Sequence, residues 1–219
     1  DKGEEKAALR ALREAICARF IRNPGYRTVP VEIPRRAEAG SDYHGVVDDW
    51  HERIAGRYRA LFDTELQHGQ TGALLVWGDP ALYDSTLRIV ERVAASGLAL
   101  DWRVYPGISS VQVLAARHRI PLNRIGAPVL LTTGRRLALG FPPDQDSVVV
   151  MLDGEQAFAK LDPAGLEIFW GAYLGMPEEI LLAGPLAEIA PRIAEVRAAA
   201  RTRHGWIMDT YLLRRRSAA

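Results

Sequence analysis

The feature that most constrains the fold of this chain is a pair of similar segments between residues 73 and 116. Residues 73–77, Ala-Leu-Leu-Val-Trp, form a continuous apolar run, which is typical of a strand buried on both faces of a parallel sheet. A Gly-Asp-Pro loop follows and leads into an amphipathic segment. Residues 100–105 predict another strand, and a Pro-Gly-Ile-Ser-Ser loop leads from it into another helix. This repeated order of strand, loop and helix predicts an α/β fold.

The N-terminal part of the chain predicts two helices and a short strand. Apolar residues recur at intervals of three and four over residues 3–22, with Lys and Arg between them, as on an amphipathic helix. A longer helix is predicted to reach Leu66, with Ser41 or Asp42 as its cap. Between the two helices, apolar residues alternate over residues 29–33, which indicates a short strand.

The C-terminal part of the chain predicts a second α/β layer. Its predicted elements are strands at residues 129–132, 148–152, 166–174 and 205–213 and a helix at residues 186–201. A length of 219 residues suits one large domain or two small ones. We therefore expect two α/β domains, residues 1–108 and residues 109–219.

Composition excludes several classes of protein. There are 28 basic and 27 acidic side chains, so a net charge of +1 makes no general case for nucleic acid or an anionic membrane as partner. No apolar run reaches the roughly 18–20 residues that span a bilayer. Cys17 is the only cysteine, which excludes an internal disulfide and a cysteine-cluster metal site. With no signal peptide before the first helix, we expect a reducing, cytoplasmic location.

The Gly-Asp-Pro loop follows the first apolar run, and open α/β folds bind ligands beyond the carboxyl ends of their strands. Gly78 allows a backbone to approach a ligand closely, and Pro80 suits the first position of a helix. Asp79 could accept hydrogen bonds from hydroxyl or amine groups, as on a nucleoside. The alternative is an ordinary tight turn in which Asp79 caps the next helix.

The Pro-Gly-Ile-Ser-Ser loop repeats this arrangement one strand later. Gly107 permits the turn, and Ser109 and Ser110 offer hydroxyls beside the free N–H groups of a helix start. The alternative is a capped helix with no ligand. Because the two loops follow successive predicted strands, they could face one crevice.

Other polar residues are candidates for acid/base chemistry. Asp84 and Ser85 suit acid/base or nucleophile roles, but no histidine lies at an informative spacing, so a hydrolase triad has little support. The five histidines are scattered: His44, His51, His68, His118 and His204. His44 and His51 could share one face of a helix, but no third ligand lies nearby, so no metal site is expected.

Arginines gather near the expected domain boundary and could bind a polycarboxylate, since guanidinium groups pair with carboxylates by two hydrogen bonds. They are Arg117, Arg119, Arg124, Arg135 and Arg136. The alternative is a solvated surface, and a solvated tail is expected for the arginines at 214–216.

Four segments, in order, resemble the tetrapyrrole (corrin/porphyrin) methylases: V-W-G-D-P-A-L-Y-D-S, V-Y-P-G-I-S-S-V-Q-V-L-A-A, L-L-T-T-G-R-R and A-Y-L-G-M-P-E-E. The resemblance covers essentially the whole chain. It implies two α/β/α domains with S-adenosylmethionine in the cleft between them, and a homodimer. The cofactor positions that it implies are Gly78, Asp79, Pro80, Tyr83, Ile108, Ser109, Ser110, Leu174, Met208 and Thr210. Leu174 matches the position under the adenine, where many relatives have Met.

Within this family the resemblance implies a reaction of aerobic cobalamin biosynthesis. Precorrin-5 would be methylated at ring carbon C-1, with loss of the C-20 acetyl group as acetate. Methyl transfer depends mainly on positioning, whereas acetyl loss needs a base and an oxyanion donor. Candidates for that chemistry are Tyr83, Asp84 and His44, and Arg135 and Arg136 are expected to bind substrate carboxylates.

The resemblance leaves other activities open. Relatives of the same fold include other precorrin methylases, diphthine synthase and an rRNA ribose methylase, although near-neutral charge argues against the RNA enzyme. The family begins with a strand and a G-x-G-x-G-D-P loop, and Asp1 matches a point after the family's second strand. We therefore expect a first domain without its first strands and part of the substrate site. A non-catalytic chain that only dimerises or binds cofactor is the alternative from another class.

Overall fold

The computed structural model describes residues 7–37 and 42–216. The chain divides into two compact units, Asp1–Gly107 and Ile108–Ala219, here called the N-terminal and C-terminal units. Each unit has its own cluster of buried apolar side chains. Within the described ranges, no helix combines the length and the apolar character needed to cross a membrane.

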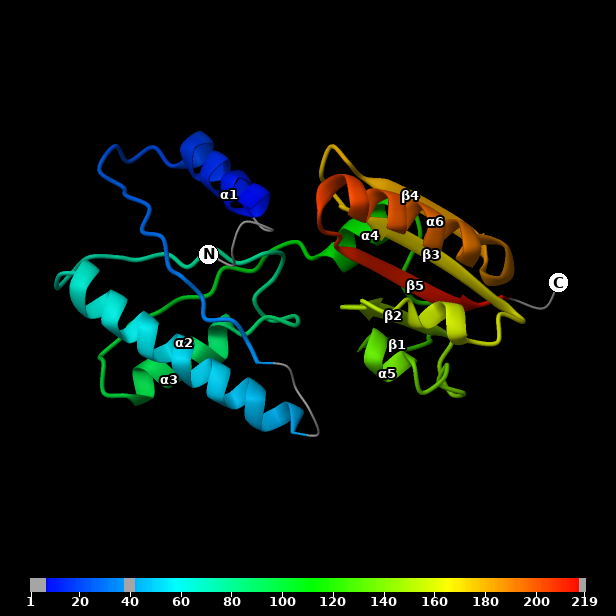
Figure 1. Cartoon of the computed structure of the whole chain (residues 1–219), viewed down its shortest axis with the longest axis horizontal. Helices are drawn as coiled ribbons and strands as arrows, with labels where there is room; N and C mark the ends of the chain where they lie inside the picture. Colours follow the sequence, from blue (N-terminus) through cyan, green and yellow to red (C-terminus); the bar gives the residue numbers. More distant parts are fainter. Residues whose placement is uncertain (1–6, 38–41, 217–219) are drawn as a thin grey trace. The chain divides into compact units, whose positions relative to one another are not determined.

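The C-terminal unit is built on a five-stranded mixed sheet with the strand order β1-β2-β5-β3-β4 (Figure 1). The strands are β1 (Val129–Thr133), β2 (Ser147–Met151), β3 (Leu166–Ala172), β4 (Ile180–Pro185) and β5 (Asp209–Arg215). Only the pairing of β1 with β2 is parallel; β2 with β5, β5 with β3 and β3 with β4 are antiparallel. The four strands predicted here are confirmed, although β3 ends at Ala172 and β5 runs from Asp209 to Arg215. The solvated tail expected for the arginines at 214–216 is therefore wrong for Arg214, which is buried in β5.

Strand β4 is a fifth strand that was not predicted. Its six residues, Ile-Leu-Leu-Ala-Gly-Pro, run directly into a helix without an intervening loop. A short apolar run of this kind is compatible with a strand or with the first turns of a buried helix. In the structure this run is a strand, because its backbone pairs with β3 at the edge of the sheet.

Helices cover both faces of this sheet. They are α4 (Ser110–His118), α5 (Gly134–Leu137), α6 (Leu186–His204) and the 3₁₀ turn η2 (Ala157–Lys160). Alternate residues of β3 point to opposite faces. On one face, the ring of Phe169 packs edge to face against His118 of α4. On the other face, the Trp170 side chain donates a hydrogen bond to the Asp209 carboxylate, which also accepts one from Arg197 of α6. The C-terminal unit therefore has the expected α/β/α layers.

The N-terminal unit contains α1 (Ala7–Phe20), α2 (Tyr43–Glu65) and α3 (Thr86–Ala95). Helices α2 and α3 lie side by side (Figure 1) and bury Ile54 and Ala55 against Ile89 and Val93. The predicted cap of α2 is confirmed at Asp42, whose Oδ1 accepts from Gly45 N at 2.8 Å; Ser41, the other candidate, lies outside the described residues.

The strands predicted at residues 29–33, 73–77 and 100–105 are wrong for this structure, since no described residue of the N-terminal unit forms a strand. Leu75 is 50% exposed and Val104 44% exposed. An apolar run can be buried as a strand only where a neighbouring backbone forms hydrogen bonds with its N–H and C=O groups. These segments make no such ladder, so their side chains stay partly in solvent.

Candidate functional site

The two glycine-bearing loops of the N-terminal unit are in direct contact. Asp79 accepts two backbone hydrogen bonds of 2.8 Å, at Oδ1 from Ala81 N and at Oδ2 from Gly107 N. A Cβ at position 107 would lie 2.0 Å from the carbonyl oxygen of Gly78. The two loops therefore lie together, and Gly107 is required because two backbones meet there; a ligand crevice that both loops face stays a prediction.

Asp79 holds this loop pair together. The two backbone donors, first Gly107 and then Ala81, lower the pKa of its carboxyl group. The alternative of a tight turn is confirmed, since Leu82 N donates to the Asp79 carbonyl at 3.2 Å. Helix α3 begins only at Thr86, so the expectations that Asp79 caps it and that Pro80 is its first residue are wrong. Each carboxylate oxygen keeps one further acceptor site, so contact between Asp79 and a cofactor stays a prediction. Pro80 beside it is buried.

The three acid/base candidates lie in different settings. Tyr83 has a positive φ of 52° and is exposed, and partial burial of its hydroxyl raises its pKa. Asp84 accepts from Thr86 N through Oδ1 at 2.6 Å, so it caps α3. His44 is exposed in the first turn of α2, with its ring edge-on to Tyr43. Their catalytic roles stay predictions.

The structure joins a histidine and a serine that the sequence does not link. His51 Nε2 of α2 lies 2.8 Å from Ser85 Oγ at the start of α3. His51 is 6% exposed, and burial, followed by the charges of Arg92 and Arg88, lowers its pKa. The spacing of the histidines from Ser85 along the sequence does not predict this pair. The pairing depends on the packing of α2 against α3, and no sequence pattern encodes it.

The C-terminal unit begins with the Ser109-Ser110 segment. Ser109 caps α4: its Oγ accepts from Val111 N, and Gln112 Oε1 accepts in return from Ser109 N at 2.9 Å. The reading of this loop as a capped helix is confirmed. Ser110 Oγ lies 2.8 Å from Thr210 Oγ1 of β5. Ile108, in contrast, is 74% exposed.

The ends of β3 and β5 bring the other expected cofactor positions to the same place. Tyr173 has a φ of 50°, and its N–H donates to the carbonyl of Met208 at 3.0 Å. The side chain of Leu174 occupies the space beside Gly171, where a Cβ would lie 2.6 Å from Leu174 Cδ2. Met208 is 44% exposed. Within this unit, Ser110, Thr210, Met208 and Leu174 therefore lie on adjoining segments, although contact with a cofactor is still a prediction for each.

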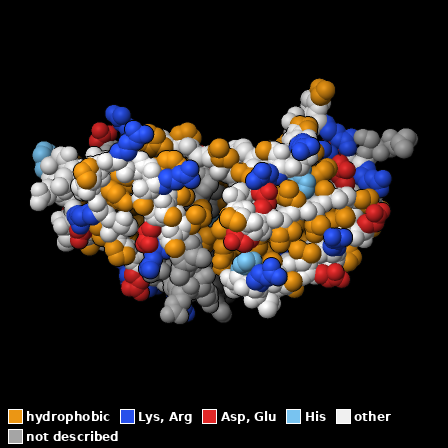
Figure 2. Space-filling model, turned by 90° about the horizontal axis from the view of Figure 1, so that it is seen from above, with side chains coloured by type: hydrophobic (Ala, Val, Ile, Leu, Met, Phe, Trp, Pro, Cys, Tyr) orange, Lys and Arg blue, Asp and Glu red, His pale blue; other side chains and the backbone are white. Residues whose placement is uncertain are grey.

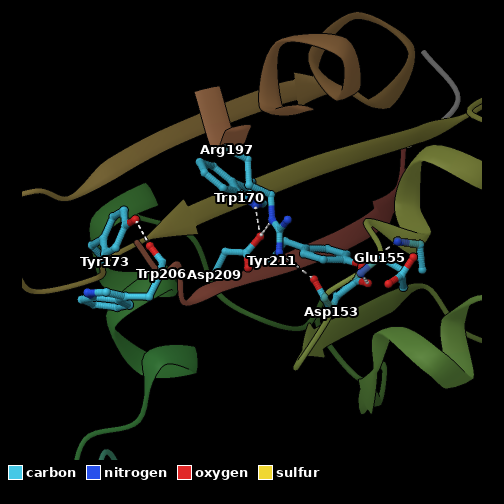
Figure 3. Close-up of polar contacts among 9 residues, drawn as sticks. Asp153, Glu155, Trp170, Tyr173, Arg197, Trp206, Asp209 and Tyr211 are labelled. Atoms are coloured by element: carbon cyan, nitrogen blue, oxygen red, sulfur yellow. Dashed lines mark hydrogen bonds and ion pairs between the residues drawn. The ribbon is translucent and has the colours of Figure 1, made fainter. Parts of the chain in front are cut away.

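A buried polar network beneath these segments holds β5 in place (Figure 3). Asp209 Oδ2 accepts from Trp170 Nε1 at 2.9 Å and from Arg197 Nε at 3.0 Å. Tyr211 Oη donates to Asp153 Oδ2 at 2.5 Å. Burial and the nearby Asp153 carboxylate raise the pKa of Tyr211 far above its ordinary value, so it stays a neutral donor. Sequence reasoning missed this network, because its members are spread over β3, β5, α6 and the loop after β2.

The predicted substrate arginines lie on α5. Arg135 and Arg136 are both exposed and lie on this short helix. Gly134 is the first residue of this helix, and a larger residue would not fit there because its Cβ would lie 2.3 Å from Asp153 Oδ1. Elsewhere in the expected arginine group, Arg117 and Arg124 form ion pairs: with Glu179 at 2.9 Å and with Asp146 at 3.2 Å. The role of Arg135 and Arg136 in binding substrate stays a prediction.

Each unit has a surface hollow near these residues. In the N-terminal unit a hollow of about 240 Å³ is lined by Pro80, Ala81, Asp84, Leu87, Arg88 and Glu91. In the C-terminal unit a more apolar hollow of about 500 Å³ is lined by Ile108, Gln112, Val113, Ala116 and Arg117. Basic and acidic side chains are interspersed on the face shown in Figure 2. Among residues 7–37 and 42–216, no three His, Cys, Asp or Glu side chains are grouped as metal ligands.

Comparisons with known proteins agree with the sequence motifs. The chain is 55% identical over 215 residues to a precorrin-6A synthase [deacetylating] from Sinorhizobium sp, covering 98% of this chain and 82% of that protein. A crystal structure of a cobalamin synthesis related protein (CobF) from Corynebacterium diphtheriae superposes with a TM-score of 0.83. It is 39% identical, and the match covers 97% of this chain and 84% of that one.

A more distant structure shares the fold. Uroporphyrin-III-C-methyltransferase from Thermus thermophilus superposes with a TM-score of 0.54 at 24% identity, over 75% of this chain and 68% of that one. The family profile described as Tetrapyrrole (Corrin/Porphyrin) Methylases matches residues 2–190. The chain belongs to the tetrapyrrole (corrin/porphyrin) methylase family.

Proposed function

We propose that this chain catalyses the methylation of precorrin-5 at C-1 by S-adenosylmethionine, with release of the C-20 acetyl group as acetate. The observation that carries the proposal is 55% identity, over 98% of the chain, to a protein named precorrin-6A synthase [deacetylating]. The superposition on CobF, at 39% identity and a TM-score of 0.83, supports the same assignment.

The proposed cofactor contacts are the positions that the family resemblance implies. In the N-terminal unit they are Gly78, Asp79, Pro80 and Tyr83, and in the C-terminal unit Ile108, Ser109, Ser110, Leu174, Met208 and Thr210. The exposed side chains of Ile108 and Met208 suit the apolar faces of an adenosine. The hydroxyl of Ser110 and the free acceptor sites of Asp79 suit its polar groups.

The residues of the chain act on this reaction chiefly by positioning. When bound, S-adenosylmethionine supplies an activated methyl group. The contact between Gly78 and Gly107 and the hydrogen bonds of Asp79 hold the loop backbone in one conformation before the ligand arrives, and such preorganisation favours an in-line approach. Arg135 and Arg136 present exposed guanidinium groups on α5, which match the carboxylates of a precorrin.

The proposal extends to the setting of the enzyme. We expect a homodimer in the cytoplasm that acts on a small tetrapyrrole and needs neither nucleic acid nor membrane. The net charge of +1 and the single cysteine support the expected partners and compartment, and the homodimer rests on the family resemblance.

Two measurements test the proposal. Calorimetry should detect S-adenosylhomocysteine binding, and Asp79→Ala should weaken it; equal affinity in both proteins would remove Asp79 from the site. Incubation with S-adenosylmethionine and precorrin-5 should then yield a methylated product and acetate in equal amounts.

One observation favours a second candidate, a chain that binds cofactor or dimerises without turnover. The described residues of the N-terminal unit form no sheet, whereas the resemblance implies one. Binding of S-adenosylhomocysteine without methyl transfer would favour this candidate, and transfer at a measurable rate would exclude it.

A further inference from the structure

The pair formed by His51 and Ser85 has the geometry of a base and a nucleophile. Their Nε2 and Oγ atoms are 2.8 Å apart, within the distance at which an imidazole takes a hydroxyl proton. Ser85 is the N-cap residue of α3, yet its side chain makes no capping hydrogen bond. Asp84 caps the first turn instead, through Thr86 N. The Ser85 hydroxyl is therefore directed to the imidazole and not to its own helix.

The surroundings keep this imidazole able to accept a proton. Its pKa is lowered chiefly by burial, so the neutral form predominates at neutral pH. The charged groups that act on it are Arg92 and Arg88 of α3, Arg36 before α2 and Asp48 of α2, of which only Asp48 opposes the shift.

Residues close to Ser85 in sequence line a surface hollow, although Ser85 itself is not one of the lining residues. Asp84, Leu87 and Arg88, on both sides of Ser85 in sequence, line the hollow of about 240 Å³ together with Pro80 of the Gly-Asp-Pro loop. Ser85 is half-buried and His51 is buried. Ser85 is therefore the more accessible of the two side chains, and the hollow beside it in sequence includes Pro80 of the loop proposed to hold the methyl donor.

We propose that Ser85 and His51 form the acyl-transfer pair that removes the acetyl group, an inference that rests on the deacetylating methylation proposed above. Ser85 Oγ attacks the acetyl carbonyl carbon, and His51 Nε2 takes the hydroxyl proton. The bond between the carbonyl carbon and the macrocycle breaks, and its electron pair stays on the macrocycle. That pair is taken up by the proton from His51 or by the methyl group of S-adenosylmethionine.

The acetyl group is then bound to Ser85 Oγ as an ester. His51 is neutral again before hydrolysis, because its proton has passed to the macrocycle or, where the methyl group took up the electron pair, to solvent. A water molecule then attacks the ester carbonyl while His51 Nε2 takes one of its protons. The carbon–oxygen bond to Ser85 breaks, the proton on His51 returns to Ser85 Oγ, and acetate leaves with loss of a proton to solvent. The overall change consumes one water and one acetyl group and regenerates both side chains.

The first experiment needs no tetrapyrrole. The wild-type chain is mixed with p-nitrophenyl acetate, quenched with acid and digested, and the peptide that contains Ser85 is examined by mass spectrometry. We expect an acetyl group on Ser85 and a burst of nitrophenolate. The burst rate should fall as pH decreases through the pKa of His51, because the protonated imidazole cannot accept a proton.

Variants separate catalysis from packing. His51→Gln keeps a hydrogen-bonding partner for Ser85 but cannot act as a base, so the burst rate should fall at least about 100-fold. Ser85→Ala should show no label. Ser96→Ala, at the other end of α3, is the matched control and should behave as wild type. An unlabelled wild-type chain, or equal labelling of wild type and Ser85→Ala, would overturn the proposal.

The second experiment uses precorrin-5 and S-adenosylmethionine. Ser85→Ala should release acetate at least about 100-fold more slowly than wild type, while its affinity for S-adenosylhomocysteine and its far-ultraviolet circular dichroism stay unchanged. Acetate release by Ser85→Ala at the wild-type rate would overturn the pair and leave the proposed function standing. A wild-type chain that neither methylates precorrin-5 nor releases acetate would contradict the proposed function, and the acetylation assay would then decide the reactivity of the pair.

Discussion

At the scale of single residues, the loop site depends on one glycine and one carboxylate. Gly107 allows the backbone of one loop to meet the carbonyl of Gly78, and Asp79 joins the loops through hydrogen bonds to two N–H groups. Both residues are visible as candidates in the sequence. The residues that they contact are not visible in the sequence. A glycine that permits a turn cannot be distinguished there from a glycine that leaves room for a second backbone.

Gly107→Ala should destabilise the N-terminal unit, because its Cβ would lie 2.0 Å from the Gly78 oxygen. A forced backbone shift of this kind costs about 1–3 kcal/mol, and the affinity for S-adenosylhomocysteine should fall with it. Gly56→Ala is the control, since nothing lies within 4 Å of a Cβ there, and alanine should stabilise α2 by up to about 1 kcal/mol. Urea denaturation measures both; equal stability of Gly107→Ala and wild type would contradict the close approach.

Asp79 makes the stability of this loop pair depend on pH. Its pKa in the folded chain is lowered by the backbone donors, so the unfolded chain binds more protons between the folded pKa and about 3.9. The stabilisation is complete above the unfolded pKa and is lost as pH falls through the folded one. Asp79→Asn should remove this acid-dependent loss, measured as the difference in urea midpoint between neutral and acidic pH. The same difference in both proteins would show that other carboxylates carry it.

At the scale of secondary-structure elements, helix and strand ends place the candidate side chains. The end of β3, the start of β5 and the start of α4 bring Leu174, Met208 and Ser110 onto adjoining segments, and Gly134 begins α5 against Asp153. The helices α1, α2, α3, α4 and α6 were predictable because the 3.6-residue pattern is local. Strand β4 and the 3₁₀ turn η2 were not, since their short runs acquire a conformation only from neighbours.

Leu174 is expected to supply an apolar surface for the cofactor. Leu174→Met keeps the volume, and such exchanges cost less than about 1.5 kcal/mol, so the affinity for S-adenosylhomocysteine should stay within about tenfold. Leu174→Asp should abolish binding while the chain still folds. Leu139→Asp, at a largely exposed position, is the control for an added charge. Normal binding by Leu174→Asp would show that Leu174 only packs against Gly171.

Arg135→Ala or Arg136→Ala should weaken precorrin binding, because each removes a charged donor from α5. A charge-assisted hydrogen bond contributes about 1.5–3 kcal/mol, so KM for the tetrapyrrole should rise roughly 10- to 150-fold. The affinity for S-adenosylhomocysteine should not change. Steady-state kinetics measures this, with Arg201→Ala in the last turn of α6 as control. Unchanged KM in both α5 variants would assign these arginines to the solvated surface.

At the scale of the whole molecule, the two units differ in how their cores are built. The C-terminal unit packs Trp170, Tyr211 and many aliphatic side chains on a hydrogen-bonded sheet. The buried cluster of the N-terminal unit is smaller and lies between α2 and α3. Stability follows the apolar area that each unit removes from water, so the units are expected to differ in resistance to unfolding.

Hydrogen exchange should show this difference, with β2, β3 and β5 protected longest and residues 71–77 and 100–107 exchanging fastest. Tyr211→Phe leaves the buried Asp153 carboxylate without this donor and should lower the unfolding free energy of the C-terminal unit by about 1–3 kcal/mol. The N-terminal unit should exchange as before in this variant. Uniform protection across both units would contradict the prediction.

The family motifs are visible in the amino-acid sequence alone, as are the main helices, four strands of the C-terminal sheet and the loops that carry the candidate cofactor residues. These depend on local periodicity and on residue types with a fixed conformational role. Three features depend on contacts between distant segments: residues 73–77 and 100–105 form no strand, Asp79 joins two loops, and His51 meets Ser85. Strand pairing and hydrogen bonds between distant residues depend on which backbones meet in the folded chain. The pattern of side chains along one segment does not identify the segment that it will meet.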